Sequence, residues 1–258
     1  MAQKNLADLP PLEAWQAEGL RLTLFPSPAA QIGEASWWKD LVGEPAAAKI
    51  VQPRIGGHQE EGPFENRKLV LRVEPIRIDW LLAPLDEGTL AAATIPTVGS
   101  FPESLNLFVP LMFRWFQAET CPPAQRLAFG ATVLLPAGDT QEGYRQISAY
   151  LPFQFDAEGS SDFSYQINRP RNSLSGISSL RINRLSKWSV MRVVLGTLAF
   201  GPASVGYSAR QMHHVCRLEL DINTTPDFPG ELSREQLPQV FQELVRFAKE
   251  IVEKGDIP

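Results

Sequence analysis

The chain has 258 residues, of which 44% are apolar and 21% are charged, and its formal net charge at pH 7 is −5. These values are ordinary for a globular protein and exclude a disordered chain, a fibrous repeat and a uniformly basic nucleic-acid coat. No apolar run reaches the roughly 20 residues that span a bilayer, and the polar start MAQKNLADLP lacks a signal-peptide core. We therefore expect a cytoplasmic protein that makes no membrane contact.

The first part of the chain predicts strands with one short helix. Residues 19–25 alternate leucines with polar residues, which is the pattern of a half-buried strand. A short helix is expected around Trp37, and residues 53–67 are rich in turn formers and charges, which predicts an exposed loop. Residues 68–82 predict two strands separated by a turn or bulge at Pro75.

A longer helix is expected in the middle of the chain. Ser100 and Glu103 have capping-box spacing, and apolar residues recur every three or four positions as far as Phe116. Pro110 lies inside this pattern and should kink the helix or divide it in two. A buried strand over residues 126–136 follows.

The last part of the chain predicts a helix, then strands, then a second helix. Asp139 and Glu142 form a further capping-box pair, for a helix running to Tyr150. A terminal helix with one apolar stripe is expected over residues 233–254. The strands expected between these helices cover residues 163–168, 180–185, 189–196 and 214–222.

This order of elements is typical of an α+β protein in which mostly antiparallel sheets pack against helices. It also allows two similar halves, although no sequence repeat is visible. The length fits a single compact unit over residues 1–258, or two closely packed subdomains over 1–122 and 123–258.

Charge is unevenly distributed along the chain. Between Phe163 and Arg217 there is no Asp or Glu, so the rest of the chain carries a net charge of −13. Such segregation indicates either a surface for an anionic partner or arginines that pair with acidic residues elsewhere in the fold. The eight basic residues of this segment are Arg169, Arg171, Arg181, Arg184, Lys187, Arg192, Arg210 and Arg217.

Two groups within the basic segment are candidate binding residues. In the sequence NRPRNS, the guanidinium groups of Arg169 and Arg171 and the amide of Asn172 could together hold a phosphate or carboxylate. The alternative is a surface loop whose arginines pair with acidic neighbours.

The second group lies in the sequence RINRLSKW. A sheet face exposing Arg181, Arg184, Lys187 and Trp188 together would combine phosphate neutralisation with base stacking. A single Trp and the acidic total weaken this nucleic-acid interpretation.

No catalytic or metal-binding motif is present in the sequence. His213 and His214 are adjacent, so on a strand their rings point to opposite faces and cannot chelate one metal ion, and we expect neither metal nor cofactor. Cys121 and Cys216 lack C-x-x-C spacing and are expected to be packed thiols. An enzyme would need a dispersed site, for example with Asp221 or His214 as the base.

The sequence from QINRPRNS through RINRLSKW to LELDINT and a terminal amphipathic helix resembles a sporadically distributed family of uncharacterised bacterial proteins of about 250 residues. The resemblance covers residues 160–257 best. It implies a stand-alone cytoplasmic protein, and it carries over no catalytic residue.

The leading functional hypothesis is a non-enzymatic binding protein whose basic sheet and loop surface engages an anionic partner. That partner is expected to be an acidic protein or a second copy of the chain, and nucleic acid is the alternative. The competing hypothesis is a hydrolase-like enzyme that binds an anionic substrate through Arg169 and Arg171.

Overall fold

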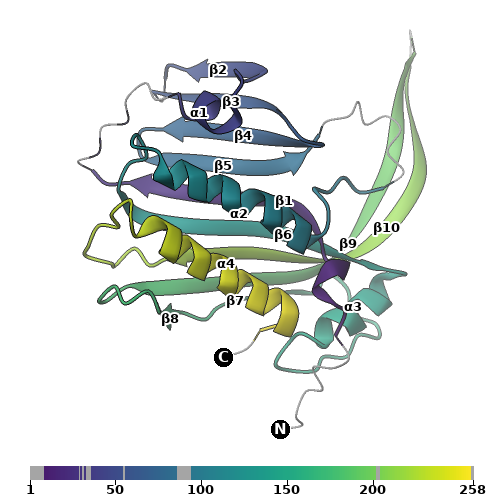
Figure 1. Ribbon diagram of the computed structural model, residues 1–258. Coiled ribbons are helices and arrows are strands. Elements are labelled where there is room, and N and C mark those ends of the chain that lie inside the picture. Colours follow the sequence, from purple (N-terminus) through teal and green to yellow (C-terminus); the bar gives the residue numbers. More distant parts are fainter. Residues whose placement is uncertain are drawn as a thin grey trace.

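The protein is described by a computed structural model (Figure 1). It describes residues 9–28, 30, 32, 36–54, 56–85, 94–201 and 204–256, and for residues 196–201 and 204–210 it describes the backbone alone. A 3₁₀ turn at Leu12–Ala14 precedes the first strand. The strands and helices in chain order are β1 Gln16–Pro26, α1 Trp37–Val42, β2 Ala48–Gln52, β3 Gly57–Phe64, β4 Arg67–Glu74, β5 Arg77–Pro84, α2 Phe101–Gln117, β6 Ala124–Ala137, α3 Thr140–Ser148, β7 Ser164–Asn168, β8 Arg171–Asn172, β9 Arg181–Gly201, β10 Ser204–Thr224 and α4 Leu237–Lys254.

All of these strands belong to one antiparallel sheet in the order β2-β3-β4-β5-β1-β6-β10-β9-β7, and β8 also pairs with β9. The expected fold class, α+β with an antiparallel sheet packed against helices, is confirmed. The order strand, helix, strands, helix occurs twice, from β1 to α2 and from β6 to α4, and β1 pairs with β6 where the two runs meet. Because one sheet crosses this junction, the division into subdomains 1–122 and 123–258 stays a prediction.

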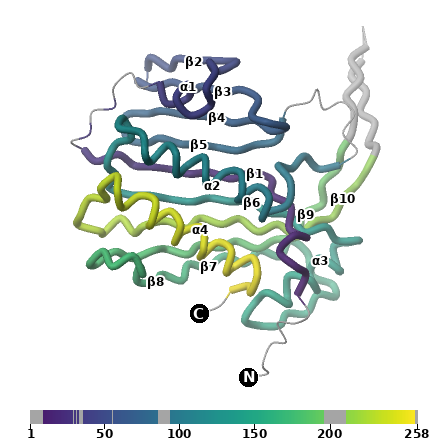
Figure 2. Tube along the Cα trace, viewed as in Figure 1, coloured from purple at the N-terminus to yellow at the C-terminus, as the bar shows by residue number. Residues whose placement is uncertain are grey.

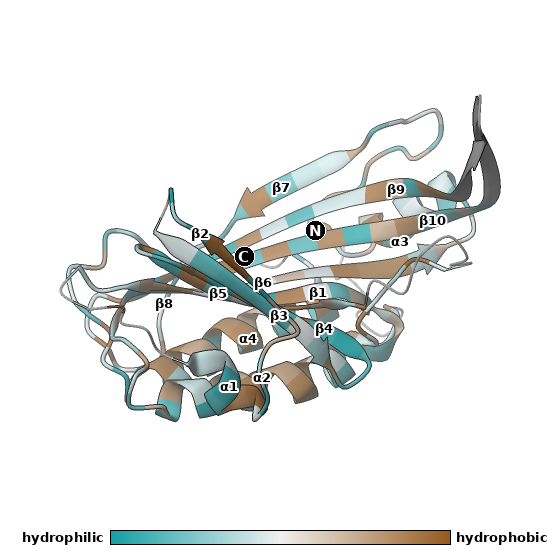
Figure 3. Ribbon diagram, turned by 90° about the horizontal axis from the view of Figure 1, so that it is seen from above, coloured by the Kyte–Doolittle hydropathy of each residue, from teal (hydrophilic) through white to brown (hydrophobic). Residues whose placement is uncertain are grey.

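Helices α2 and α4 cover one face of the sheet, here called the helical face, and Figure 3 shows α1 on that side as well. Leu20, Leu22 and Leu24 of β1 are at most 2% exposed and belong to the core beneath these helices. Since side chains alternate along a strand, Arg21 and Thr23 point to the opposite side, here called the open face. The helices leave the open face uncovered (Figure 3).

The helix starts expected from capping residues are confirmed. The Glu103 carboxylate accepts a hydrogen bond from the Ser100 backbone N–H at 3.1 Å, and Asp139 accepts one from the Glu142 N–H at 2.7 Å. Helix α2 runs through Pro110 without being divided, and α4 starts at Leu237, after the expected Ser233. Among the described helices, none has the length and apolarity needed to cross a bilayer.

The prediction of an exposed loop over residues 53–67 is wrong. Most of this segment is β3, which pairs with β4 on one side and with β2 on the other. Strand β2 is the edge of the sheet and its residues are largely exposed, so it lacks the apolar alternation by which a strand is recognised. Backbone hydrogen bonds to neighbouring strands therefore form β2 and β3, although their side-chain pattern does not predict strands.

The strands expected over 180–185 and 189–196 are parts of the single strand β9, which forms a hairpin with β10. Strand β6 pairs with β10 only from His214 onward, and β7 pairs with β9 only as far as Ser189. Residues 190–201 and 204–213 therefore have no strand neighbour outside β9 and β10, and we call them the hairpin ribbon. The ribbon leaves the sheet near α3 and projects from the body (Figures 1 and 2).

Candidate functional site

The predicted binding residues fall into two groups in the structure. Arg169, Arg171 and Arg184 gather against α4 and the residues after it, on the helical side of the sheet. The others, Asn172, Arg181, Lys187 and Trp188, lie along β8 and β9 and do not join them.

Arg169 is held by a carboxylate just beyond the end of α4. Its Nε and Nη2 donate to Asp256 at 2.5 and 2.9 Å, and the Tyr165 hydroxyl donates to the same carboxylate at 2.7 Å. Burial alone would raise the pKa of Asp256, but the hydrogen bonds from Arg169 and Tyr165 lower it by more, so the carboxyl stays ionised. The guanidinium of Arg169 is thereby neutralised within the chain.

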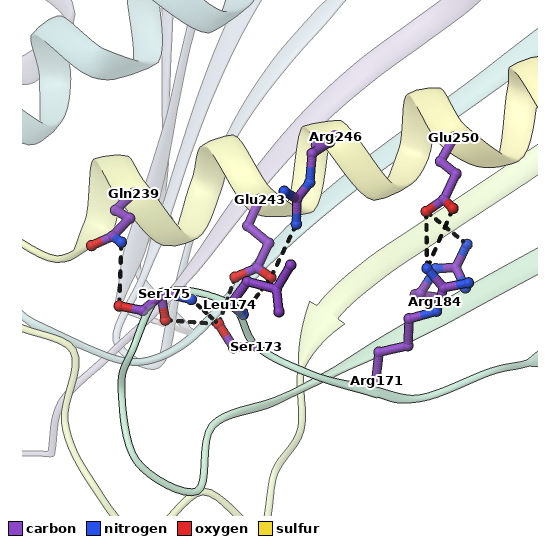
Figure 4. Close-up of polar contacts among 9 residues, drawn as sticks. All are labelled: Arg171, Ser173, Leu174, Ser175, Arg184, Gln239, Glu243, Arg246 and Glu250. Atoms are coloured by element: carbon purple, nitrogen blue, oxygen red, sulfur yellow. Dashed lines mark hydrogen bonds and ion pairs between the residues drawn. The ribbon is translucent and has the colours of Figure 1, made fainter.

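Arg171 and Arg184 share one carboxylate of α4 (Figure 4). Glu250 accepts from Arg171 Nη1 at 3.1 Å and from Arg184 Nη2 at 3.4 Å. The side chain of Arg184 is 1% exposed, and its guanidinium lies 5.3 Å from the ring centroid of Phe247. Burial, and then the charge of Arg171, lower the pKa of Arg184. Its Nε and Nη1 have no hydrogen-bond partner among the described residues.

A second carboxylate of α4 fixes the loop that follows β8. Glu243 is 6% exposed and accepts from the Ser173 hydroxyl at 2.5 Å and from the Leu174 N–H at 2.7 Å (Figure 4). The side chain of Gln239 donates to the Ser175 carbonyl at 3.2 Å in the same loop. The segment from Arg169 to Leu174 is thus bound to α4 by Glu243 and Glu250 and to the following turn by Asp256. This is the geometry of the alternative interpretation, in which the arginines pair with acidic neighbours.

Trp188 and Arg184 do not share an exposed face with Lys187 and Arg181. Trp188 is fully buried, stacked on Tyr150 with ring centroids 5.4 Å apart. Lys187 points to the open face, 43% exposed, with its Nζ 3.3 Å from Glu219, and Arg181 and Asn172 are exposed where β9 meets β8. The expectation of one joint exposed face is wrong, because adjacent strand residues alternate sides. Whether the exposed residues bind a partner stays a prediction.

The residues considered for a hydrolase lie apart. His214 contacts the Thr140 hydroxyl at 3.1 Å beside α3, whereas Asp221 lies on the open face and accepts from Asn223 at 3.1 Å. Neither is near Arg169 and Arg171, which are held at the end of α4. Cys216 is fully buried, and burial raises the pKa of its thiol to about 12, as for a packed residue rather than a nucleophile. The described part of the chain contains no cluster of His, Cys, Asp and Glu that could hold a metal ion.

The surface that sequence reasoning missed is the hairpin ribbon. Met191, Val194 and Met212 are 39%, 44% and 56% exposed. Val194 pairs with Met212 across the ribbon, and Met191 points to the other side, so both faces of the ribbon present apolar side chains. The sequence MRVVLG predicts a strand, but it does not indicate that no helix or further strand covers that strand.

Searches of protein-family models, curated proteins and solved structures find no match to this chain. The resemblance to the uncharacterised bacterial family therefore stays a prediction, and the functional argument depends on the geometry alone.

Proposed function

We propose that the protein is a non-enzymatic binding protein of the cytoplasm that docks onto an acidic, partly apolar protein surface through its hairpin ribbon. The observation that carries the proposal is that the ribbon has no strand neighbour outside β9 and β10 while it exposes Met191, Val194 and Met212. This keeps the hypothesis of a basic surface for an anionic partner, but it moves the contact from the 169–174 segment to the outer part of β9 and β10.

The apolar side chains favour a partner that covers the ribbon. A two-stranded hairpin without a packing layer is marginally stable in water. Complete burial of a Val or Met side chain contributes about 1.5–3 kcal/mol, so covering each half-exposed side chain would contribute on the order of 1 kcal/mol. Exposed apolar groups gathered on one projecting element are typical of an interaction surface.

Charge favours an acidic partner. The ribbon lies inside the segment without Asp or Glu, and its charged residues, Arg192 and Arg210, are both basic. Arg192 is exposed and makes no ion pair with any other described residue. A carboxylate facing Arg192 would add attraction and would steer the encounter of the two proteins.

Protein is favoured over nucleic acid because the broad open face is not cationic. Its arginines and lysines are interleaved with carboxylates, as in the pairs Arg77–Asp79, Lys187–Glu219 and Arg217–Glu18. Binding to a phosphate backbone draws its affinity from an excess of unpaired cations. A second copy of the chain could also supply an acidic surface, since the residues outside the basic segment are acidic overall. The experiment must therefore distinguish self-association from binding of another protein.

A photo-crosslinking residue at Val194 in cells tests the proposal. We expect a crosslink to a distinct protein, and binding of that purified protein should weaken at least about tenfold for Met212→Asp and for Arg192→Glu. Ile76→Asp is the matched control, because Ile76 is 76% exposed on the β4–β5 turn, away from the ribbon, and its change should leave affinity unchanged.

Three outcomes would overturn the proposal. They are the lack of any crosslinked protein, equal weakening by Ile76→Asp, and crosslinks to nucleic acid only. Crosslinks between copies, together with a molar mass that halves in Met212→Asp, would replace the acidic partner with a second copy of this chain.

A further inference from the structure

The open face contains a hollow of about 580 Å³ that the hairpin ribbon does not use. It extends across β5, β1, β6, β10 and β9 as far as β7 at the edge of the sheet. Its floor consists of small residues on adjacent strands, Ala83, Gly19 and Gly130. Short side chains on three neighbouring strands leave backbone at the bottom of the hollow. Longer side chains, both polar and apolar, surround it, among them Leu81 beside Arg21 and Leu185 beside Asp221.

Arg21 reaches across the floor of this hollow. It is directly opposite Gly130 on the neighbouring strand β6. A Cβ placed at Gly130 would lie 3.4 Å from both Nε and Nη2 of Arg21, which shows that the guanidinium rests on the glycine. A larger residue at position 130 would push the guanidinium away.

Asp221 lies on the far side of Gly130 in the same row of the sheet. It is the residue of β10 that pairs with Gly130, so Arg21, Gly130 and Asp221 occupy neighbouring positions on three strands. The Asp221 carboxylate accepts a hydrogen bond from Asn223 at 3.1 Å. Arg21 and Asp221 therefore face each other across a residue without a side chain.

These two charges differ from the others around the hollow in having no opposite charge bound to them. Glu18 pairs with Arg217 at 3.3 Å, and Lys187 pairs with Glu219 at 3.3 Å. Neither Arg21 nor Asp221 makes an ion pair with a described residue, and the buried Nε of Arg21 has no acceptor. The hollow thus holds one cation and one carboxylate that no described residue neutralises through an ion pair.

We propose that the hollow binds a small zwitterion of the amino-acid type, with its carboxylate on Arg21 and its ammonium on Asp221. The planar guanidinium donates two parallel hydrogen bonds to a carboxylate, and a carboxylate is the natural acceptor for an ammonium group. Thr132 and Gln166 also line the hollow and offer uncharged hydrogen-bonding groups for the middle of such a ligand. The site is independent of the proposed docking by the ribbon.

Calorimetric titration of the full chain at pH 7 with glycine, β-alanine and 4-aminobutyrate tests this site, because the three probes differ in the separation of their charges. We expect saturable binding of at least one, and a loss of at least about tenfold in affinity for both Arg21→Gln and Asp221→Asn. Arg21→Lys keeps the charge but loses the paired donors, so its affinity should fall between those of wild type and Arg21→Gln.

Arg72→Gln is the matched control. Arg72 is an arginine of the same face that bonds Gln59, outside the hollow, and its replacement should leave the affinity unchanged. Failure of all three probes to saturate would overturn the proposal, and so would unchanged binding in Arg21→Gln. Acetate binding as tightly as the amino acids would replace the zwitterion site with a plain anion site. Circular dichroism of each variant separates lost binding from lost folding.

Discussion

The guanidinium of Arg169 donates two hydrogen bonds to the carboxylate of Asp256, at 2.5 and 2.9 Å. They join the segment before β8 to the turn after α4, 87 positions later in the sequence. The pair ties the turn after α4 to the sheet, because separating them would break the hydrogen bonds that Arg169 and Tyr165 donate to Asp256. The basic segment is thus part of the protein's own stability.

Asp256→Asn should lower the free energy of unfolding by about 1–3 kcal/mol, because it leaves Arg169 beside a neutral amide and removes a charged acceptor for Tyr165. Urea denaturation monitored by tryptophan fluorescence measures the change. Glu253→Gln, at an exposed position near the end of α4, is the control and should change stability by less than about 0.5 kcal/mol. Equal effects of the two changes would show that the pair contributes nothing.

The contribution of Asp256 should depend on pH. Its pKa is lower in the folded protein than in the unfolded chain, so the folded state binds fewer protons than the unfolded state. The stabilisation is therefore fully present above the unfolded pKa of about 3.9. It is lost as the pH falls through the lowered folded pKa. The stability difference between wild type and Asp256→Asn should be constant from about pH 5 to 7 and should shrink below about pH 4. A difference that grows on acidification would contradict the assignment.

Arg184→Met should be neutral or stabilising by up to about 1 kcal/mol, although it removes an ion pair. Two of the three guanidinium nitrogens of Arg184 have no partner among the described residues, and Glu250 keeps Arg171 after the change. Glu250→Gln, in contrast, should destabilise, because it leaves Arg184 buried without a carboxylate. Thermal unfolding of both variants distinguishes these signs, and a large loss in Arg184→Met would show that the buried pair is net stabilising.

Gly255→Ala should destabilise far more than Gly159→Ala. Both glycines have positive φ angles, +82° and +71°, so each alanine costs about 1 kcal/mol of backbone strain. A Cβ at Gly255 would also overlap the Tyr150 carbonyl, whereas nothing lies within 4 Å of one at Gly159. Chemical denaturation should give a loss of several kcal/mol for the first variant only. Similar losses would mean that the turn after α4 yields easily.

Cys121 and Cys216 should not react with a thiol reagent at pH 8 in the folded protein. They are 4% and 0% exposed, and burial raises the pKa of each thiol to about 12. Unfolding should release two reactive thiols. Rapid labelling of Cys216 without denaturant would show that α3 opens from the sheet, since the Cys216 Sγ contacts the Gly143 carbonyl.

The parts of the fold that sequence predicts are those with local signals. Ser100 and Asp139 start helices through bonds to residues three positions away, and the leucines of β1 alternate within one strand. Strands β2 and β3 escaped prediction because their pairing is made by backbone groups and their side chains are largely polar or exposed.

The candidate site was harder to predict because its partners are distant in sequence. Arg171 meets Glu250 79 positions later, and no local pattern indicates which carboxylate an arginine will find. Trp188 and Lys187 are neighbours in sequence but lie on opposite sides of β9, so a shared composition does not mean a shared surface. The segregation of charge is visible in the sequence, but the pairing of Arg171 and Arg184 with Glu250 of α4 is not.

Strand β9 is 21 residues long, which at 3.3 Å per residue makes a path of about 70 Å. Only its first part is braced by β7, and the remainder carries the projecting ribbon. Val194 of the proposed docking surface lies seven positions beyond Lys187 at the rim of the hollow, which is about 23 Å along the strand. A partner protein on the ribbon and a small ligand in the hollow could therefore be bound at the same time.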